Sequence, residues 1–142
     1  MNMNGAKRID HLALLAPLTI VDFCTKFSAA LGLPEMQFDY ENETEWGIVE
    51  FMGIEYNVSR PFEEGILHEW DSSVPKGCNF GITLSIGKNY HLENESDWVE
   101  ENLLKVVGKQ LASTFETSVY HHRTWLGAGR NEIKNTIFKT MK

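Results

Sequence analysis

Several stretches of this sequence alternate between apolar and polar residues, and this period of two constrains the fold more than any other feature. In residues 54–59 three apolar side chains alternate with three polar ones, and in residues 78–86 apolar side chains recur at every second position from Phe80 to Ile86. Successive side chains of a strand point to opposite faces of its sheet, so both stretches predict strands with one buried face. Further strands are expected at residues 9–15, 36–40, 46–51, 118–125 and 132–140.

Two other stretches have the spacing of amphipathic helices. The first begins after Thr19, a good N-cap residue with Asp22 three positions later, and ends at Gly32, which Pro34 follows. Its apolar face is expected to contain Ile20, Phe23, Cys24, Phe27, Ala30 and Leu31. The second helix is expected to begin after Ser96, with an apolar face formed by Val99, Leu103, Val106, Val107, Leu111 and Phe115.

The predicted elements follow the order β-α-β-β-β-β-α-β-β. Runs of strands with two separate helices are typical of the α+β class, so we expect a single antiparallel or mixed sheet with the helices packed on one face. A length of 142 residues without an internal linker predicts one domain over residues 1–142. Residues 62–76 form a long predicted connection, and connections of this length are often functional.

Composition narrows the classes of function. The formal net charge of −7 argues against a nucleic-acid partner, whose phosphates need a basic surface. No apolar run is long enough to span a membrane, and the first residues lack the apolar centre of a signal peptide, so we expect a cytoplasmic protein without a membrane partner. Cys24 and Cys78 fit that compartment as reduced thiols, with Cys24 packed in the core.

The charges are unevenly distributed along the chain. Residues 35–71 contain eleven acidic residues and a single full positive charge, Arg60. Residues 117–142 reverse this balance, with Arg123 and Arg130 among the basic residues, and these two arginines form a candidate anion site. The acidic segment predicts attraction of a basic partner. The two segments could also contact each other, within one molecule or between two copies, so a homodimer stays an open alternative.

Aromatic residues lie among the acidic ones, and Trp46 and Trp70 are each next to acids in or beside a loop. Aromatic anchors surrounded by carboxylates are typical of protein interfaces. We therefore expect a partner-binding surface made of Glu41, Glu43, Glu45, Trp46, Glu63, Glu64, Glu69, Trp70 and Asp71.

The sequence contains no Gly-x-Ser-x-Gly elbow, phosphate-binding loop or Cys-x-x-Cys pair, so we predict no catalytic residues and no cofactor. In general character the chain resembles immunity proteins, which are small acidic proteins that neutralise toxins. The resemblance implies a non-enzymatic binding protein that covers the active site of a basic, nuclease-like toxin.

The first third of the chain also resembles a vicinal-oxygen-chelate module, as found in glyoxalases. The matching segments are Ile9–Leu14, Phe23 with Lys26, Leu31–Pro34, and Ile54–Asn57. The resemblance implies a divalent-metal site with His11 and Glu55 as the first two ligands, and a lyase or dioxygenase activity or an inert relative. The second half departs from the family pattern, because Phe80 or Asn79 stands where a ligand histidine is expected.

Overall fold

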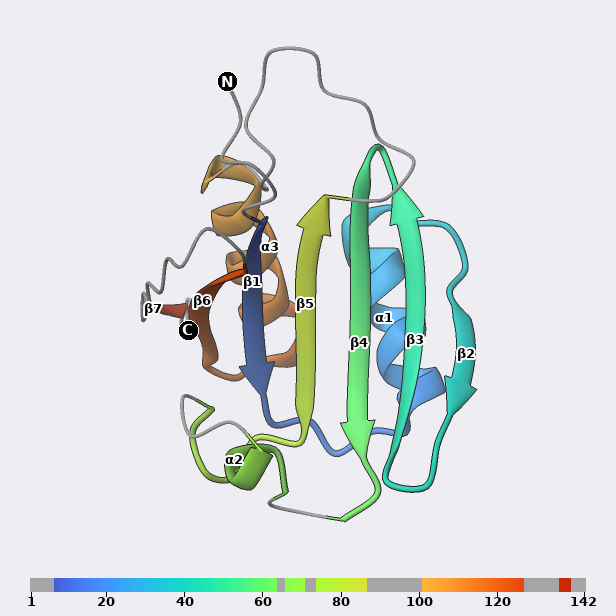
Figure 1. Cartoon of the computed structure of the whole chain (residues 1–142). Helices are drawn as coiled ribbons and strands as arrows, with labels where there is room; N and C mark the ends of the chain where they lie inside the picture. Colours follow the sequence, from blue (N-terminus) through green and yellow to red (C-terminus); the bar gives the residue numbers. More distant parts are fainter. Residues whose placement is uncertain (1–6, 64–65, 71–73, 87–100, 127–135, 139–142) are drawn as a thin grey trace.

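The protein is represented by a computed structural model that describes residues 7–63, 66–70, 74–86, 101–126 and 136–138. Its strands form one antiparallel sheet in the order β2-β3-β4-β5-β1-β6-β7 (Figure 1). The strands are β1 (Lys7–Leu14), β2 (Gln37–Tyr40), β3 (Thr44–Phe51), β4 (Ile54–Pro61), β5 (Phe80–Ile86), β6 (Val119–Leu126) and β7 (Thr136–Phe138). The helices are α1 (Ile20–Leu31), α2 (Ile66–Trp70) and α3 (Glu101–Phe115).

The α+β class and the single sheet with two helices on one face are confirmed. Helices α1 and α3 lie side by side behind the sheet in the view of Figure 1. We call the opposite side of the sheet the open face, although α2 covers part of it, where Leu67 packs in a buried cluster with Ala13. The predicted order of elements is also found, with the short helix α2 added inside the connection predicted for residues 62–76. Within the described residues, no helix is both long and apolar enough to cross a membrane.

Helix α1 forms where its sequence signals place it. The Thr19 hydroxyl oxygen accepts a hydrogen bond from the Asp22 amide at 3.1 Å, and Gly32 ends the helix in the left-handed conformation, with φ 69°. The Leu33 amide then donates to the Ser28 carbonyl at 2.9 Å, which completes a Schellman-type end. A capped start and a glycine end explain why this helix has the predicted length.

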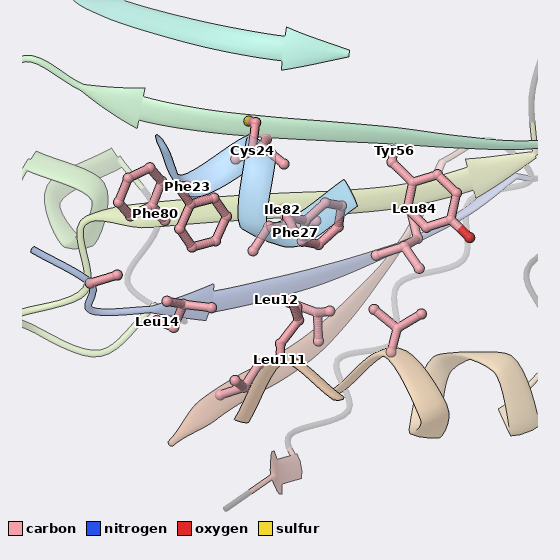
Figure 2. Close-up of a cluster of buried hydrophobic side chains, with 14 of the residues drawn as sticks. Leu12, Leu14, Phe23, Cys24, Phe27, Tyr56, Phe80, Ile82, Leu84 and Leu111 are labelled. Carbon is pink, nitrogen blue, oxygen red and sulfur yellow. The ribbon is translucent and has the colours of Figure 1, made fainter. Parts of the chain in front are cut away.

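The main core lies between the sheet and helices α1 and α3 (Figure 2). The Phe23 ring of α1 stacks on Phe80 of β5, with centroids 4.0 Å apart, and on Phe115 of α3 at 4.4 Å. One aromatic side chain therefore joins both helices to the centre of the sheet.

The predicted core face of the second helix is partly wrong. Leu104, Val107 and Leu111 are buried, whereas Val106 is 57% exposed. Val106 lies two residues after Leu104, about 200° around the helix, and so on its far side. Val99 and the predicted cap Ser96 lie outside the described residues.

The turn predicted at Met52–Gly53 joins β3 to β4 as a two-residue hairpin. Both residues have positive φ, 51° for Met52 and 82° for Gly53, and Phe51 pairs with Ile54 across the turn. Two positive φ angles are the mark of a type I′ turn, whose twist matches that of the flanking strands.

Candidate functional site

The strongest candidate site lies at the end of the sheet where the β2–β3 hairpin meets the end of β4. The Glu41 amide donates to the Thr44 carbonyl at 2.8 Å, which closes the hairpin, and the Phe62 amide donates to the Glu43 carbonyl at 3.0 Å. These backbone bonds hold Glu43 and Phe62 at the same end of the molecule, which is also the end near α2 in Figure 1.

Three adjacent pockets open here. The first, of about 470 Å³, is lined by Asn42, Glu43, Phe62, Glu63, Ile66 and Trp70. The second, of about 430 Å³, shares Phe62 and reaches the start of α1 and strand β2. The third, of about 390 Å³, shares Trp70 with the first and adds Glu41 and Thr44. Because neighbouring pockets share Phe62 and Trp70, they form one surface, which we call the end groove.

The end groove combines exposed aromatic side chains with carboxylates. Tyr40 is 73% exposed, Phe62 51% and Trp70 49%, although each has a large apolar ring. The groove lining includes five carboxylates: Asp39, Glu41, Glu43, Glu45 and Glu63. Among the described lining residues there is no lysine or arginine. Clustered exposed apolar side chains with charged neighbours are typical of a protein-binding surface.

The predicted partner-binding residues are only partly brought together. Glu41, Glu43, Glu63 and Trp70 line the end groove as described above. Glu45 lines it too, but its Oε2 accepts a hydrogen bond from Arg60 Nη1 at 2.9 Å, so the acidic segment's single full positive charge neutralises this carboxylate.

Other predicted residues lie elsewhere. Trp46 is on the open face, opposite Ser59 of β4, and is not among the described lining residues. Glu69 is exposed on α2 without lining these pockets. Glu64 and Asp71 lie outside the described residues. Of the remaining acids, Glu35 precedes β2, and Glu50 and Glu55 belong to the β3–β4 hairpin at the other end of the sheet, so the acidic segment does not form one continuous surface.

Sequence reasoning missed the apolar part of the groove. Only Trp46 and Trp70 were predicted as aromatic anchors, whereas Phe38, Tyr40 and Phe62 are all exposed. Phe38 and Tyr40 lie in β2, the short strand at the end of the sheet order, and Phe62 directly follows β4. The shortness of residues 36–40 and the proline before Phe62 were the available signals, because strand ends and edge strands bury less surface than central strands.

His11 and Glu55 share the open face but lie on different strands. His11 of β1 is opposite Thr83 of β5, while Glu55 of β4 is opposite Ser85 of β5, so β5 runs between them. Two strand spacings and a two-residue offset separate their Cα atoms by roughly 12 Å. The His11 ring stacks on His122, with centroids 4.4 Å apart and planes 4° apart. The two candidate ligands thus do not converge, and the described residues contain no group of three or more metal-binding side chains arranged around one point.

A second charged cluster lies inside the protein, on the helix-covered face. Asp10 Oδ1 is 2.9 Å from both His121 Nε2 and Arg123 Nε, and all three residues are buried. We call these three residues the inward cluster. The neighbours His121 and His122 point to opposite faces of the sheet, since His122 stacks on His11 on the open face.

The inward cluster changes the interpretation of Arg123. This residue was predicted as part of a basic surface and, with Arg130, as a candidate anion site, but it is only 5% exposed and is bound to Asp10. Isolated charges are rarely buried because desolvation is costly, so the aspartate compensates the arginine. Arg130 lies outside the described residues.

Both cysteines are buried and unreactive in character, as expected for Cys24. Burial, with a smaller contribution from the nearby Glu45 carboxylate, raises the pKa of Cys24 to about 12, and burial raises the pKa of Cys78 to about 11. Both thiols therefore stay protonated near neutral pH, whereas nucleophilic cysteines have lowered pKa values.

Comparison of this chain with protein-family models, curated proteins and solved structures found no match.

Proposed function

We propose that this protein is a non-enzymatic binding protein whose end groove receives a basic surface of a partner protein. The observation that carries this proposal is the coincidence of three features in one groove: linked pockets, exposed aromatic rings and five carboxylates. Aromatic anchors provide most of the binding energy at protein interfaces, while surrounding charges favour a complementary partner.

A cationic toxin of the nuclease type is a suitable partner. Such an enzyme binds phosphates with lysine and arginine side chains, and Glu43 and Glu63 at the first pocket can pair with those same side chains. An inhibitor bound in this way acts by covering the active site. Close charge pairs across an interface contribute coupling energies of roughly 1.5–7 kcal/mol in favourable cases. Covering the active site of a toxin in this way is how an immunity protein acts.

The test uses two variants with the same change in charge. In Glu43→Lys/Glu63→Lys the reversals lie in the end groove, and in Glu50→Lys/Glu55→Lys they lie at the opposite end of the sheet. Basic proteins captured from the native cell by the unaltered protein are identified and tested as nucleases, and their affinity for each variant is measured by calorimetry. We expect the groove variant to lose roughly 100-fold in affinity or more.

The opposite-end variant is expected to lose less than threefold, and wild-type binding is expected to weaken as salt increases. A captured basic protein that binds both variants equally would contradict the proposal. Elemental analysis tests the glyoxalase-like alternative: stoichiometric metal that is lost in His11→Ala would favour the metal site and contradict a purely binding function.

A further inference from the structure

We propose that the outer edge of β2 receives an extended segment of the partner, which contains basic and apolar residues and adds to the sheet as a further strand. This inference rests on the proposed function and specifies how the partner is bound. It commits to one mode of recognition, strand addition, in which backbone hydrogen bonds provide affinity and side-chain pockets provide specificity.

Strand β2 stands at the end of the strand order and pairs with β3 along one side (Figure 1). All four of its residues, Gln37 to Tyr40, are exposed. An edge strand with an exposed backbone is a template for pairing with another chain.

The hydrogen-bond pattern shows which backbone groups face outward. The Glu41 amide donates to the Thr44 carbonyl, so these two residues form a hydrogen-bonded pair beside the Tyr40–Glu45 pair. Bonded and non-bonded pairs alternate in antiparallel sheets, so the backbone groups of Phe38 and Tyr40 point away from β3. The Tyr40 amide accordingly donates to the Asp39 carboxylate at 2.8 Å rather than to β3.

The side chains on this edge offer space for an added strand. Phe38 and Tyr40 are exposed on the helix-covered side of the sheet, where the second pocket of the end groove lies beside them. Another pocket, of about 350 Å³, lies between α1 and β2 and is lined by Val21, Thr25, Ser28, Met36 and Phe38 among others. Alternate side chains of an added strand point to the same face, so two of them can occupy these two neighbouring pockets.

Charge determines which strand fits. Glu35, Asp39 and Glu41 lie in or directly beside β2, and all three are exposed. Antiparallel pairing of β2 with a second copy would bring these carboxylates close to their own equivalents, which is unfavourable. A strand carrying lysine or arginine instead pairs with them, and Asp39 is free to exchange its bond with the Tyr40 amide for one with a cation. The edge therefore suits a basic partner segment better than another copy of this chain.

The experiment uses peptides of defined composition and the full-length protein. The first probe is an acetylated and amidated peptide of four Lys-Val repeats, and its control has four Glu-Val repeats. We expect only the Lys-Val peptide to bind and to slow hydrogen exchange of the Phe38 and Tyr40 amides at least tenfold by NMR. The Met52 amide, at the opposite end of the sheet, is expected to be unchanged.

Two variants distinguish the contribution of the backbone amide to peptide binding from that of the side chain at this edge. Tyr40→Val and Tyr40→Pro both remove the aromatic ring, but only Tyr40→Pro removes the outward amide. That amide does not donate to β3, so the β2–β3 ladder is expected to survive. We expect Tyr40→Pro to bind the Lys-Val peptide at least tenfold more weakly than Tyr40→Val.

Three other outcomes would contradict the inference, and they can be distinguished from one another. If the Lys-Val peptide binds and Glu43→Lys/Glu63→Lys weakens it, but exchange at Phe38 and Tyr40 is unchanged, strand addition is wrong while the proposed function stands. If the peptide does not bind, strand addition is wrong and the capture experiment alone decides the function. A homodimer in sedimentation analysis that Tyr40→Pro dissociates would assign the edge to a second copy instead.

Discussion

The inward cluster and the end groove both contain charged side chains, but these charges serve different purposes in the two places. In the inward cluster, Asp10 lies 2.9 Å from His121 and from Arg123 and is buried beneath the helices. In the end groove, most carboxylates face solvent, and only Glu45 has a cationic partner among the contacts described. Charges that are matched internally stabilise one conformation, whereas charges left unmatched at a surface are available to another molecule.

The largest expected effect comes from breaking the inward cluster. Asp10→Asn removes the carboxylate charge that lies 2.9 Å from Arg123 and His121 in the buried cluster, so we expect a loss of about 3–5 kcal/mol in the free energy of unfolding. Urea denaturation measures it, with Glu43→Gln as the matched change in the end groove, expected within about 0.5 kcal/mol of wild type. Adding Arg123→Met to Asp10→Asn is expected to recover part of the loss. Equal free energies of unfolding for Asp10→Asn and Glu43→Gln would show that the charge in the inward cluster contributes no more to stability than the charge in the end groove.

Gly47 tests the contact between the groove and the core. A Cβ atom at this position would lie 2.9 Å from Phe38 Cε1 in the groove and 3.1 Å from Cys24 Sγ in the core. We expect Gly47→Ala to cost about 1–3 kcal/mol in thermal or urea unfolding. The half-exposed Phe38 ring can move, whereas Cys24 is fixed in α1. A cost that disappears in Phe38→Ala/Gly47→Ala would therefore mean that the groove side alone causes the strain.

The titration of Cys24 links the end groove to the hydrophobic core. Cys24 lies in the core, and Glu45 of the groove adds to the effect of burial on its pKa. The pKa is about 12 in the folded protein, against 9.0 for an unperturbed thiol, so unfolding releases this proton at alkaline pH. Stability is unaffected below pH 9 and falls as pH rises from there towards 12, by about 1 kcal/mol between pH 9 and 10. Urea denaturation across this range measures the slope. The slope should decrease in Cys24→Ala, and an unchanged slope would mean that other groups dominate.

The smallest expected effect is a gain in stability away from both regions. Glu50 and Glu55 are directly opposite each other on β3 and β4, one pair from the hairpin turn. Like charges in this arrangement repel, so Glu50→Lys is expected to stabilise the protein by about 0.2–1 kcal/mol, and by less at high salt. Thermal unfolding at two salt concentrations measures the gain. Glu43→Lys serves as the control, and a similar gain there would point to a general effect of net charge.

The parts of the fold that could be predicted are those whose signals are local. The cap at Thr19, the glycine at position 32 and the alternation from Ile54 to Val58 each act over a few residues, and the corresponding helix and strand were found. Helix α2 was missed because five residues are too few to show helical spacing; Leu67 holds it against Ala13 and Val74.

The sites depend on long-range register, which a single sequence does not contain. Asp10 and His121 are 111 positions apart, and they meet because β1 pairs with β6 in one particular alignment. The end groove was half predicted: Glu43, Glu63 and Trp70 were expected, whereas Phe62 was not, since an aromatic residue at a strand end has the same local pattern as one in a core. Trp46 shows the reverse error, because it was expected to be an interface anchor beside a loop, whereas β3 begins at Thr44 and Trp46 lies on the open face.

The position of β1 has a consequence for synthesis on the ribosome. Among the strands of this sheet β1 is synthesised first, but its neighbours in the sheet are β5 and β6. While residues 15–79 emerge, β1 has neither neighbour, and its apolar residues Leu12 and Leu14 have no completed core to enter. The residues of β1 are therefore exposed to aggregation until β6 has left the exit tunnel. Sheets that are completed by pairing of strands distant in the sequence also fold slowly. Chaperone dependence during translation is thus expected to centre on the first strand rather than on the exposed aromatics of the finished protein.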